Sequence, residues 1–473
     1  MTAHSMADGA GGRRRAALGM WVVGFGTLIN PLDTSVNIAF PAITAAFGIV
    51  LADIQWVVIS YVLTYASLML AFGKLGDLYG HRRIFAAGLA LSAVSFVLCG
   101  VAESFAGLLA ARVLQGVGTA LVVAVGPALA TGLYDEAARA RVLGLYTMMY
   151  GIGAAAGPLV GGVLIEHWGW SAVFWFRLPL SVLALALVFV LPAHVPAPGQ
   201  RARFDIIGAV LLVGGLCALL LALNRLRGVA DDLGLVLALG ALAAAALTGF
   251  VLQERRAADP IIRLDVFRRP GFAVLNLTCA VTQAVSFTVL LLVPYFLVRS
   301  AELPLWLAGI VLAASPAGII VGGPLGGRLS ARVRSDRLVL FATVLAGLAL
   351  LPMALWRPNT AVPLIALMLF VHGLALGLFQ MAYLDLVTAA LPRGERGVAG
   401  GLAMATRTVG IMLGAGSMAA LFAALEAGAL SGGASPGEAF LEGFRLSFAC
   451  AGGGLLAYLA LAAALRKMGT VPN

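Results

Sequence analysis

Residues 16–40 of the chain read AALGMWVVGFGTLINPLDTSVNIAF, and this stretch decides how the rest of the sequence is interpreted. It is apolar except near its middle, where the acid Asp33 follows the turn-forming residues Asn30 and Pro31. The stretch forms either one long helix with a buried acid or two short segments separated by a turn. The choice fixes the orientation of every later segment.

The composition excludes a soluble globular protein. Of the 473 residues, 61% are hydrophobic and 11% are charged, and the mean hydropathy is +1.01. Soluble proteins carry roughly 25% charged residues, because polar side chains must cover the core. We therefore expect a lipid bilayer as the solvent of this chain. The net charge of +10 comes from arginines spread along the whole sequence, which excludes the clustered basic patch of a nucleic-acid-binding protein.

Loop charges settle the choice in favour of one helix. A spanning helix needs about 20 apolar residues, and cytoplasmic loops are rich in Lys and Arg. With a single helix at 16–40, the charge-free stretches give fourteen spans, and 23 of the 31 Lys and Arg residues lie on the side of both termini. A turn at Asp33 would reverse this bias and leave a first helix of about 14 residues, which is too short. The sequence predicts an all-α polytopic membrane protein with fourteen transmembrane helices and cytoplasmic termini.

An internal repeat predicts the domain organisation. Residues 73–83, GKLGDLYGHRR, have a degraded copy that begins with GGPLGGR at 322–328, about 250 residues later. A six-helix unit would take roughly 190 residues, so two helices are inserted between the copies. We expect two six-helix pseudo-repeat bundles plus two inserted helices. The predicted boundaries are a cytoplasmic tail at 1–15, a bundle at 16–191, a cytoplasmic linker at 192–204, the inserted helices at 205–253, a second linker at 254–270, the second bundle at 271–467 and a tail at 468–473.

Five short motifs, in chain order, carry a family resemblance. They are LDTSVNIAFP at 32–41, GKLGDLYGHRR at 73–83, AARVLQGVGTAL at 110–121, GIGAAAGPLVGG at 151–162 and WGWSAVFWFRLPLS at 168–181. Together they resemble the major facilitator superfamily and, within it, the fourteen-helix drug:proton antiporters. Two positions depart from the family pattern, which has a basic residue at Leu78 and Asn at Arg177. The sequence gives no role to Arg177.

Asp33 and Arg112 are the candidate proton-coupling residues. Charged groups inside a membrane usually face a water-filled cavity and mark ion or proton pathways. The resemblance places both residues on helices that line the central cavity, so Arg112 can pair with an ionised Asp33 and part from a protonated one. The alternatives are that Asp33 is a structural acid bonded to its neighbours Thr34, Ser35 or Asn37, and that Arg112 reaches out to the membrane interface.

Two further motifs are expected to govern conformational change. In the first, glycines permit a tight turn and an acid sits near a helix N-terminus, which would form a latch that holds one conformation. The latch residues are Gly73, Gly76, Asp77, Gly80, Arg82 and Arg83. In the second, small residues allow close helix packing on the fifth helix. The residues of this antiporter motif are Gly153, Gly157, Pro158, Gly161 and Gly162.

Candidates for a substrate cavity are the aromatic, Met and amide residues on the expected cavity helices. Aromatic faces hold cations, and Met adapts to varied shapes. Lipid-facing or core packing is the alternative for each of them. The candidates are Tyr61, Tyr65, Gln115, Tyr146, Met149, Tyr150, Asn276, Gln283, Phe379, Gln380 and Tyr383.

The predicted function is proton-coupled export of amphipathic, often cationic, drugs or biocides by alternating access. The partners are a small amphipathic substrate, protons and the lipid bilayer. No catalytic residue, metal, nucleic acid or cofactor is expected, since the proton gradient drives transport. The expected location is the bacterial inner membrane. An exporter of one metabolite, lipid or siderophore is the first alternative, and a transporter-like receptor or a membrane enzyme is a remote one.

Overall fold

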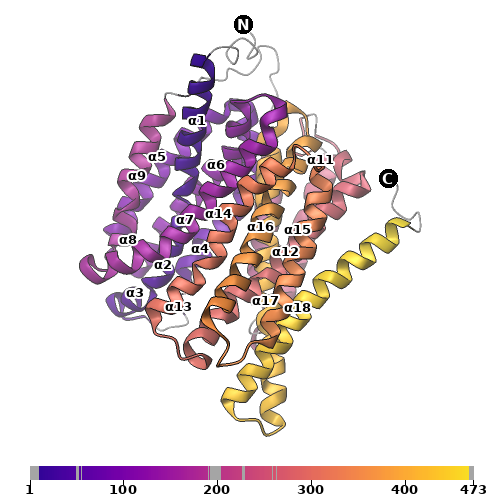
Figure 1. Cartoon of the computed structure of the whole chain (residues 1–473). Helices are drawn as coiled ribbons and strands as arrows, with labels where there is room; N and C mark the ends of the chain where they lie inside the picture. The colour runs from indigo at the N-terminus through magenta and orange to yellow at the C-terminus, as the bar shows by residue number, and fades with distance from the viewer. Residues whose placement is uncertain are drawn as a thin grey trace. The chain divides into compact units, whose positions relative to one another are not determined.

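The computed structural model describes residues 10–49, 53–54, 56–189, 191, 204–225, 229–257, 259–262 and 264–467 (Figure 1). The predicted C-terminal tail at 468–473 lies wholly outside these residues, and so do residues 1–9 of the N-terminal tail and residues 192–203 of the first linker.

Every regular element among the described residues is a helix. The first group is α1 (Ala10–Leu28), η2 (Pro31–Thr34), α2 (Ser35–Ile38), α3 (Phe40–Phe47), α4 (Trp56–Tyr79), α5 (His81–Gly100), α6 (Phe105–Gly132), η3 (Glu136–Ala138), α7 (Arg139–Trp168), α8 (Ala172–Trp175) and α9 (Arg177–Val188). The second group is α10 (Ile206–Arg225), α11 (Val229–Glu254), η5 (Leu264–Arg268), α12 (Pro270–Tyr295), η6 (Phe296–Ser300), α13 (Leu305–Leu312), α14 (Ala314–Leu329), α15 (Ser335–Leu350), η7 (Leu351–Leu355), α16 (Val362–Ala390), η8 (Arg393–Glu395), α17 (Arg396–Ser431) and α18 (Pro436–Lys467).

The helical architecture is confirmed, whereas the count of fourteen spans is not. Among the described residues, twelve helical segments are long and apolar enough to cross a membrane. The two predicted spans that fall short are built from shorter pieces. The first is divided among α1, η2, α2 and α3, and the other is the short apolar segment Ala172–Val188.

The chain divides into two compact units. Unit 1 combines Met1–Val213 with Phe250–Ile262 and Val387–Ala405, and unit 2 holds the remaining segments. In unit 1, α6 packs against both α4 and α5. Glycines permit this packing, since a Cβ on Gly118 of α6 would meet Ser92 of α5 at 2.7–2.9 Å. The buried α6 therefore holds its polar side chains inside unit 1.

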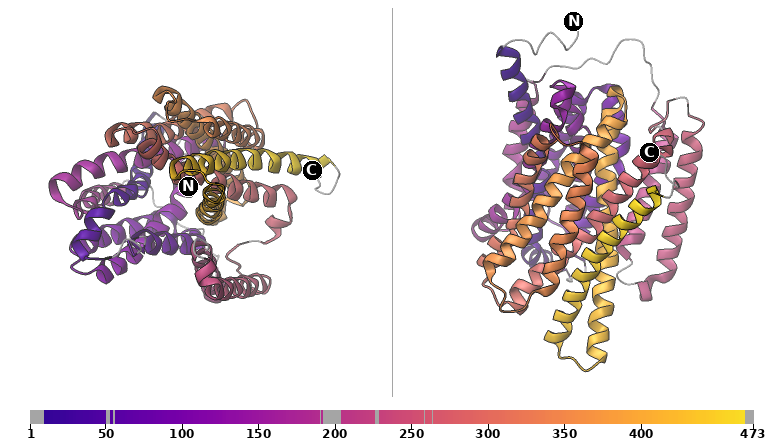
Figure 2. Two further views of the ribbon diagram at one scale, coloured as in Figure 1. Left: turned by 90° about the horizontal axis from the view of Figure 1, so that it is seen from below. Right: turned by 45° about the vertical axis from the view of Figure 1, so that its right-hand side comes forward.

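Unit 2 has an aromatic core. The rings of Phe296 and Phe444 stack at 4.8 Å between centroids, and Trp356 and Phe448 lie against Phe444. Near their connection, α17 and α18 lie side by side, and the rings of Phe422 and Phe440 meet edge to face at 5.6 Å (Figure 2). Large rings bury much apolar surface, which locks these helices together.

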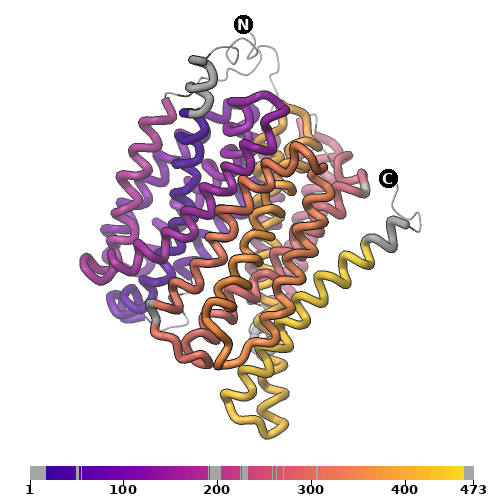
Figure 3. The backbone as a smooth tube through the Cα atoms, in the orientation of Figure 1, coloured from indigo at the N-terminus to yellow at the C-terminus, as the bar shows by residue number. Residues whose placement is uncertain are grey.

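The opening stretch forms a broken helix. α1 ends at Leu28, and the tight helical turn η2 at Pro31–Thr34 carries Asp33 before the chain resumes as α2 and α3. The backbone of Asn30 stays right-handed helical, at φ −65° and ψ −57°, so the chain continues in the same general direction (Figure 3). The expectation of one uninterrupted helix is therefore wrong, although the chain does not reverse. Pro31 supplies no N–H for a regular α-helix, and η2 accommodates this.

Candidate functional site

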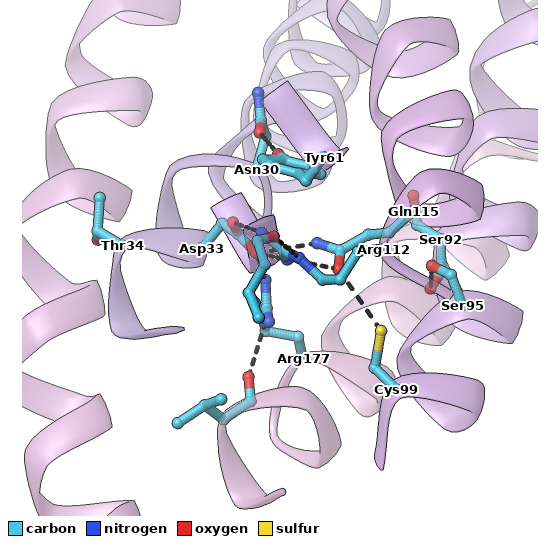
Figure 4. Close-up of polar contacts among 12 residues, drawn as sticks. Asn30, Asp33, Thr34, Tyr61, Ser92, Ser95, Cys99, Arg112, Gln115 and Arg177 are labelled. Atoms are coloured by element: carbon cyan, nitrogen blue, oxygen red, sulfur yellow. Dashed lines mark hydrogen bonds and ion pairs between the residues drawn. The ribbon is translucent and has the colours of Figure 1, made fainter. Parts of the chain in front are cut away.

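A buried cluster of charged groups surrounds Asp33 (Figure 4). Arg112 of α6 grips the carboxylate as a fork, with Nη1 donating to Oδ1 and Nη2 to Oδ2, both at 2.7 Å. Gln115, one turn along α6, donates from Nε2 to Oδ1 at 2.9 Å. Arg112 is fixed in turn, because Nε donates to the carbonyl of Val57 and Nη1 to Oε1 of Gln115. Planar two-point pairing of this kind is the strongest contact that a guanidinium makes with a carboxylate.

Arg177 is a second guanidinium on the same carboxylate. From the start of α9, its Nη1 donates to Asp33 Oδ1 at 2.5 Å, and its Nε donates to the carbonyl of Val173 at 2.8 Å. The side chains of Arg112 and Arg177 are both 0% exposed. The Nη2 atom of Arg177 has no hydrogen-bond partner among the described residues. Sequence reasoning missed Arg177, and the available signal was that an arginine replaces the family's Asn at this position.

Aromatic rings take the place of water around the two guanidinium groups. The Tyr61 ring centroid lies 4.3 Å from Cζ of Arg112, and the Phe96 and Phe174 centroids lie 4.7 and 5.2 Å from Cζ of Arg177. Ring faces attract cations, most strongly where water is excluded. The hydroxyl of Tyr61 also donates to Oδ1 of Asn30, just before η2. The rings therefore help to hold both cations inside the apolar unit.

The structure brings Asp33, Arg112 and Gln115 together, and it does not show the contacts that the two structural alternatives require. Arg112 does not reach the interface, since it is fully buried. No hydrogen bond joins Asp33 to the side chains of its described neighbours. Thr34 donates instead to the carbonyl of Pro31, and the buried hydroxyl of Ser35 has no partner among the described residues.

A small pocket lies beside the cluster, within unit 1. Its polar lining consists of the side-chain amide of Asn30, which precedes η2, and of polar side chains on α5 and α6. One of these, Gln115, also donates a hydrogen bond to Asp33. The lining residues are Gly26, Ile29, Asn30, Leu89, Ser92, Phe96, Gln115, Thr119 and Val122.

The glycines of the antiporter motif seat the segment that carries Asp33. A Cβ on Gly153 would meet the carbonyl of Leu28, and one on Gly157 would meet Oγ1 of Thr34. A Cβ on Gly161 would meet Ser35 at 2.8 Å. The other two motif residues do not share this face, because Gly162 has open space around it and Pro158 is exposed. Three of the five predicted residues therefore allow α7 to lie directly against η2 and α2.

The predicted latch contact at a helix N-terminus is present. Asp77, near the end of α4, accepts hydrogen bonds from the backbone N–H groups of Gly397 at 2.7 Å and Val398 at 3.0 Å, in the first turn of α17. His81 lies 2.8 Å from the same carboxylate. The first turn of a helix presents free N–H groups and partial positive charge, so it suits an anion.

The other predicted latch residues act differently from the expectation. Gly73 and Gly76 lie inside α4 and do not form a turn, and a Cβ on Gly73 would meet the backbone of Gly397. Only Gly80, at φ 96°, forms the turn between α4 and α5. Arg82 donates to the carbonyl of Phe189 at 3.0 Å, and Arg83 is exposed. The hydrogen-bond partners of Asp77 among the described residues are His81, Gly397 and Val398 instead.

Sequence reasoning also missed an acid next to the latch. Glu136, at the start of η3, pairs with Arg139, with Arg396 and, at 3.4 Å, with Arg393. Arg396 begins α17, immediately before the residues that bind Asp77. Two acids of unit 1, Asp77 and Glu136, therefore hold the same helix start.

The substrate-cavity candidates fall into both units. In unit 1, Tyr61, Gln115, Tyr146 and Met149 are buried, whereas Tyr65 and Tyr150 are half-buried. Tyr61 and Gln115 belong to the Asp33 cluster, and the Tyr65 ring packs on Tyr61 with centroids 5.0 Å apart.

In unit 2, four candidates are buried and Gln380 is half-buried. The hydroxyl of Tyr383 donates to Oδ1 of Asn276 at 2.9 Å, and Thr406 donates to the same atom at 3.2 Å. Phe379 stacks on Tyr383, with a plane angle of 6° and centroids 5.8 Å apart. Gln283 lies two turns beyond Asn276 on the same helix, α12. Their role in substrate binding stays a prediction.

The described residues contain no group of three or more His, Cys, Asp or Glu side chains placed to hold a metal ion. Asp385, to which the sequence assigns no role, is buried at the end of α16. It accepts a hydrogen bond from Oγ of Ser335 at 2.6 Å.

Comparison with known proteins places the chain in one family. The sequence model of the Major Facilitator Superfamily matches residues 23–415 of the chain. The tetracenomycin C resistance and export protein of Streptomyces glaucescens is 32% identical, over 89% of this chain and 78% of that protein. A multidrug resistance protein of Mycobacterium tuberculosis is 31% identical, over 87% and 76%. A riboflavin transporter of Clostridioides difficile is 28% identical, over 85% and 87%.

Solved structures show the same fold. The crystal structure of a human organic anion transporter superposes with a TM-score of 0.66, at 18% sequence identity, and covers 94% of this chain and 99% of that one. A proton:xylose symporter superposes with a TM-score of 0.60, at 12% identity, over 94% and 96% of the two chains.

Proposed function

This chain belongs to the Major Facilitator Superfamily, and we propose that it exports amphipathic drugs or biocides in exchange for protons. Family membership makes it a multi-pass membrane transporter of small molecules rather than an enzyme. The proposed substrate class follows the relatives, which are named as resistance and export proteins. The energy source is the proton gradient, with no cofactor.

The observation that carries the proton-coupling proposal is the double grip on Asp33. In the described arrangement the carboxylate accepts four hydrogen bonds, three of them from guanidinium N–H groups. A proton on Asp33 would leave two buried cations without a counter-charge, which is costly in an apolar interior. Asp33 therefore takes up a proton when Arg112 and Arg177 move away from it. Proton binding is thereby linked to a change of conformation.

The glycine face of α7 and the latch serve this change. The glycines let the segment that carries Asp33 slide on α7 without steric conflict. The latch contact of Asp77 with Gly397 and Val398 stabilises one of the alternating-access states, and Glu136 reinforces it through Arg396. In this proposal Arg82 and Arg83 contribute to orientation in the membrane.

We further propose that the chain crosses a bacterial inner membrane fourteen times, with both termini in the cytoplasm. The broken segment α1–α3 and the segment Ala172–Val188 supply the two spans beyond the twelve long ones. The proposed organisation is two six-helix bundles with α10 and α11 as the inserted pair. Asp205 braces this pair, because Gln253 donates to its carboxylate at 3.2 Å.

Efflux of a panel of dyes and biocides tests the function. The protein is expressed in a host without its own pumps, and efflux is compared for the wild type, Asp33→Asn and the exposed-site control Asp53→Asn. We expect the wild type and the control to export several compounds against a gradient. Asp33→Asn should lose uphill transport and transport-linked proton movement in inverted vesicles. Uphill export and proton movement at the wild-type rate by Asp33→Asn would disprove the coupling role.

A second candidate, export of one metabolite, is favoured by the relative named as a riboflavin transporter. The same efflux panel separates the two proposals. A broad profile supports drug export, whereas transport of riboflavin alone supports the metabolite exporter.

A further inference from the structure

His372 is a buried titratable side chain that the proposed mechanism does not use. It lies within α16 of unit 2 and is 1% exposed. Its Nε2 atom lies 3.2 Å from Oγ of Ser286 on α12, and its Nδ1 atom is buried without a hydrogen-bond partner among the described residues. A buried polar nitrogen without a partner is costly, so a function that requires it is the stronger explanation.

The helices α12 and α14, which contact His372 and its neighbour Gly373, bring no counter-charge, and α17, which packs on α12 at Gly410 and Gly414, brings the cation Arg407. α16 contacts α12 through Ser286 and α14 through Ser315, whose carbonyl lies beside Gly373. The sequences of α12 and α13 contain no Asp, Glu, Lys, Arg or other His, and α14 has only Arg328, near its far end. On these helices, Cys279 and Tyr295 of α12 and Tyr383 and Asp385 of α16 are the remaining titratable groups, all at least two turns from His372 or Ser286 along their own helices. The ring is therefore neutral in the described arrangement.

The face of α12 near His372 is polar. Gln283 and Ser286 are buried there, and Thr282 has a buried hydroxyl without a partner among the described residues. Polar groups at this density on a membrane helix mark a face that meets water or a polar ligand during the transport cycle.

We propose that His372 is a second proton-binding site, in unit 2, separate from the Asp33 cluster of unit 1. The proposal rests on the proposed proton-coupled transport. Nε2–H donates to Ser286 Oγ, which leaves the lone pair of Nδ1 to accept the proton and give a cationic imidazolium. The ring takes up this proton when the polar face of α12 is hydrated and releases it when the face closes. The two sites differ in kind, because Asp33 becomes neutral on protonation whereas His372 becomes positive.

Titration of the ring by NMR tests the proposal without any substrate. The chain has five histidines, so protein in lipid nanodiscs with ¹⁵N-labelled histidine rings gives few signals. The signal absent from His372→Gln belongs to His372, and the exposed control His167→Gln identifies a surface ring in the same spectrum. We expect the His372 signal to move between pH 5 and pH 8.5, and Ser286→Ala to change its midpoint. A His372 signal that is constant over this range would overturn the proposal.

Ethidium efflux supplies the second readout. In the wild type and in His167→Gln, the efflux rate should vary with pH between pH 6 and pH 8. In His372→Gln the profile should be displaced while ethidium binding is kept, because Asp33 still couples efflux to protons, and an unchanged pH profile would overturn the proposal. If His372→Gln does not fold, Ser286→Ala keeps the imidazole and should show a displaced profile. If Asp33→Asn leaves proton coupling unchanged, only the proposed role of Asp33 is contradicted. The proposal for His372 is tested separately, by the NMR titration of its ring.

Discussion

At the scale of residues, the molecule surrounds one carboxylate with two guanidinium groups of unequal importance. Arg112 makes four hydrogen bonds, two to Asp33, one to Val57 and one to Gln115. Arg177 makes two, one to Asp33 and one to Val173. Arg112 therefore organises the cluster, and Arg177 supplements the charge.

The two arginines should differ when each is removed. Loss of one partner from a buried ion pair costs about 3–5 kcal/mol, and we expect Arg112→Ala to reach this range. Arg177→Ala should lower the stability less, because Asp33 keeps both hydrogen bonds from Arg112. In addition, the Nη2 atom of Arg177 makes no hydrogen bond that the substitution could remove. Thermal unfolding in detergent measures the order, and a greater loss of stability in Arg177→Ala would contradict it.

The core of this cluster could be predicted from the sequence, whereas its third charge could not. An acid inside an apolar stretch and an arginine inside another are visible in the sequence, and Gln115 follows by helical spacing. Arg177 lies 144 positions from Asp33. No periodicity links positions so far apart, and only the packing of α9 brings Arg177 to the carboxylate. The same reason applies to Glu136, whose partner Arg396 is 260 positions away.

At the scale of elements, the decisive contact is between the glycine face of α7 and the broken first helix. Hydropathy reveals that residues 16–40 are apolar, but the break depends on Pro31 and on what packs against it. Gly153, Gly157 and Gly161 recur every fourth residue, which predicts a small-residue face. The sequence cannot say that this face receives η2.

Substitutions on the two sides of α7 test this contact. In Gly157→Ala the new Cβ meets Oγ1 of Thr34 and the carbonyl of Leu32, so η2 must shift and Asp33 must lose its alignment with Arg112. We expect at least a tenfold fall in uphill efflux, which corresponds to about 1.4 kcal/mol. The matched control is Gly162→Ala, whose Cβ enters open space and should leave efflux unchanged. Equal effects of the two substitutions would refute the importance of the glycine face.

The latch offers a second test at this scale. Asp77→Ala removes two hydrogen bonds to the first turn of α17, each worth about 1.5–3 kcal/mol because a charged group is involved. We expect slower efflux and a shift in the accessibility of single introduced cysteines toward the state without the latch. Asp336→Ala is the control, since Asp336 is exposed and pairs with exposed Arg334. Accessibility identical to the wild type in Asp77→Ala would exclude the latch role.

At the scale of the whole molecule, the distribution of arginines among the loops is the main sequence feature that predicts the orientation of the chain in the membrane. Length and composition identify twelve long spans in the described residues. Hydropathy also identifies the other two predicted spans as apolar. It does not predict that their helices are interrupted, because the hydropathy of a residue does not determine where a helix ends. The predicted orientation therefore depends on loop charges.

Reporter fusions test the span count and the orientation together. A phosphatase that is active only outside the cytoplasm is fused after residue 434, in the connection between α17 and α18, and after residue 473. We expect activity at the first site and none at the second, with the opposite result for a fluorescent protein that folds only in the cytoplasm. Phosphatase activity after residue 473 would disprove the proposed topology.

The surplus guanidinium beside Asp33 also has an electrostatic consequence for cargo. With Asp33 ionised, the cluster of Asp33, Arg112 and Arg177 carries one net positive charge, and a proton raises it to two. Two unit charges 10 Å apart repel by about 1.7 kcal/mol at an effective dielectric constant near 20. A cationic compound inside unit 1 would therefore meet stronger repulsion once the proton has bound. In the proposed mechanism, a proton on Asp33 and a cationic substrate would therefore disfavour each other's binding through electrostatic repulsion, without direct contact.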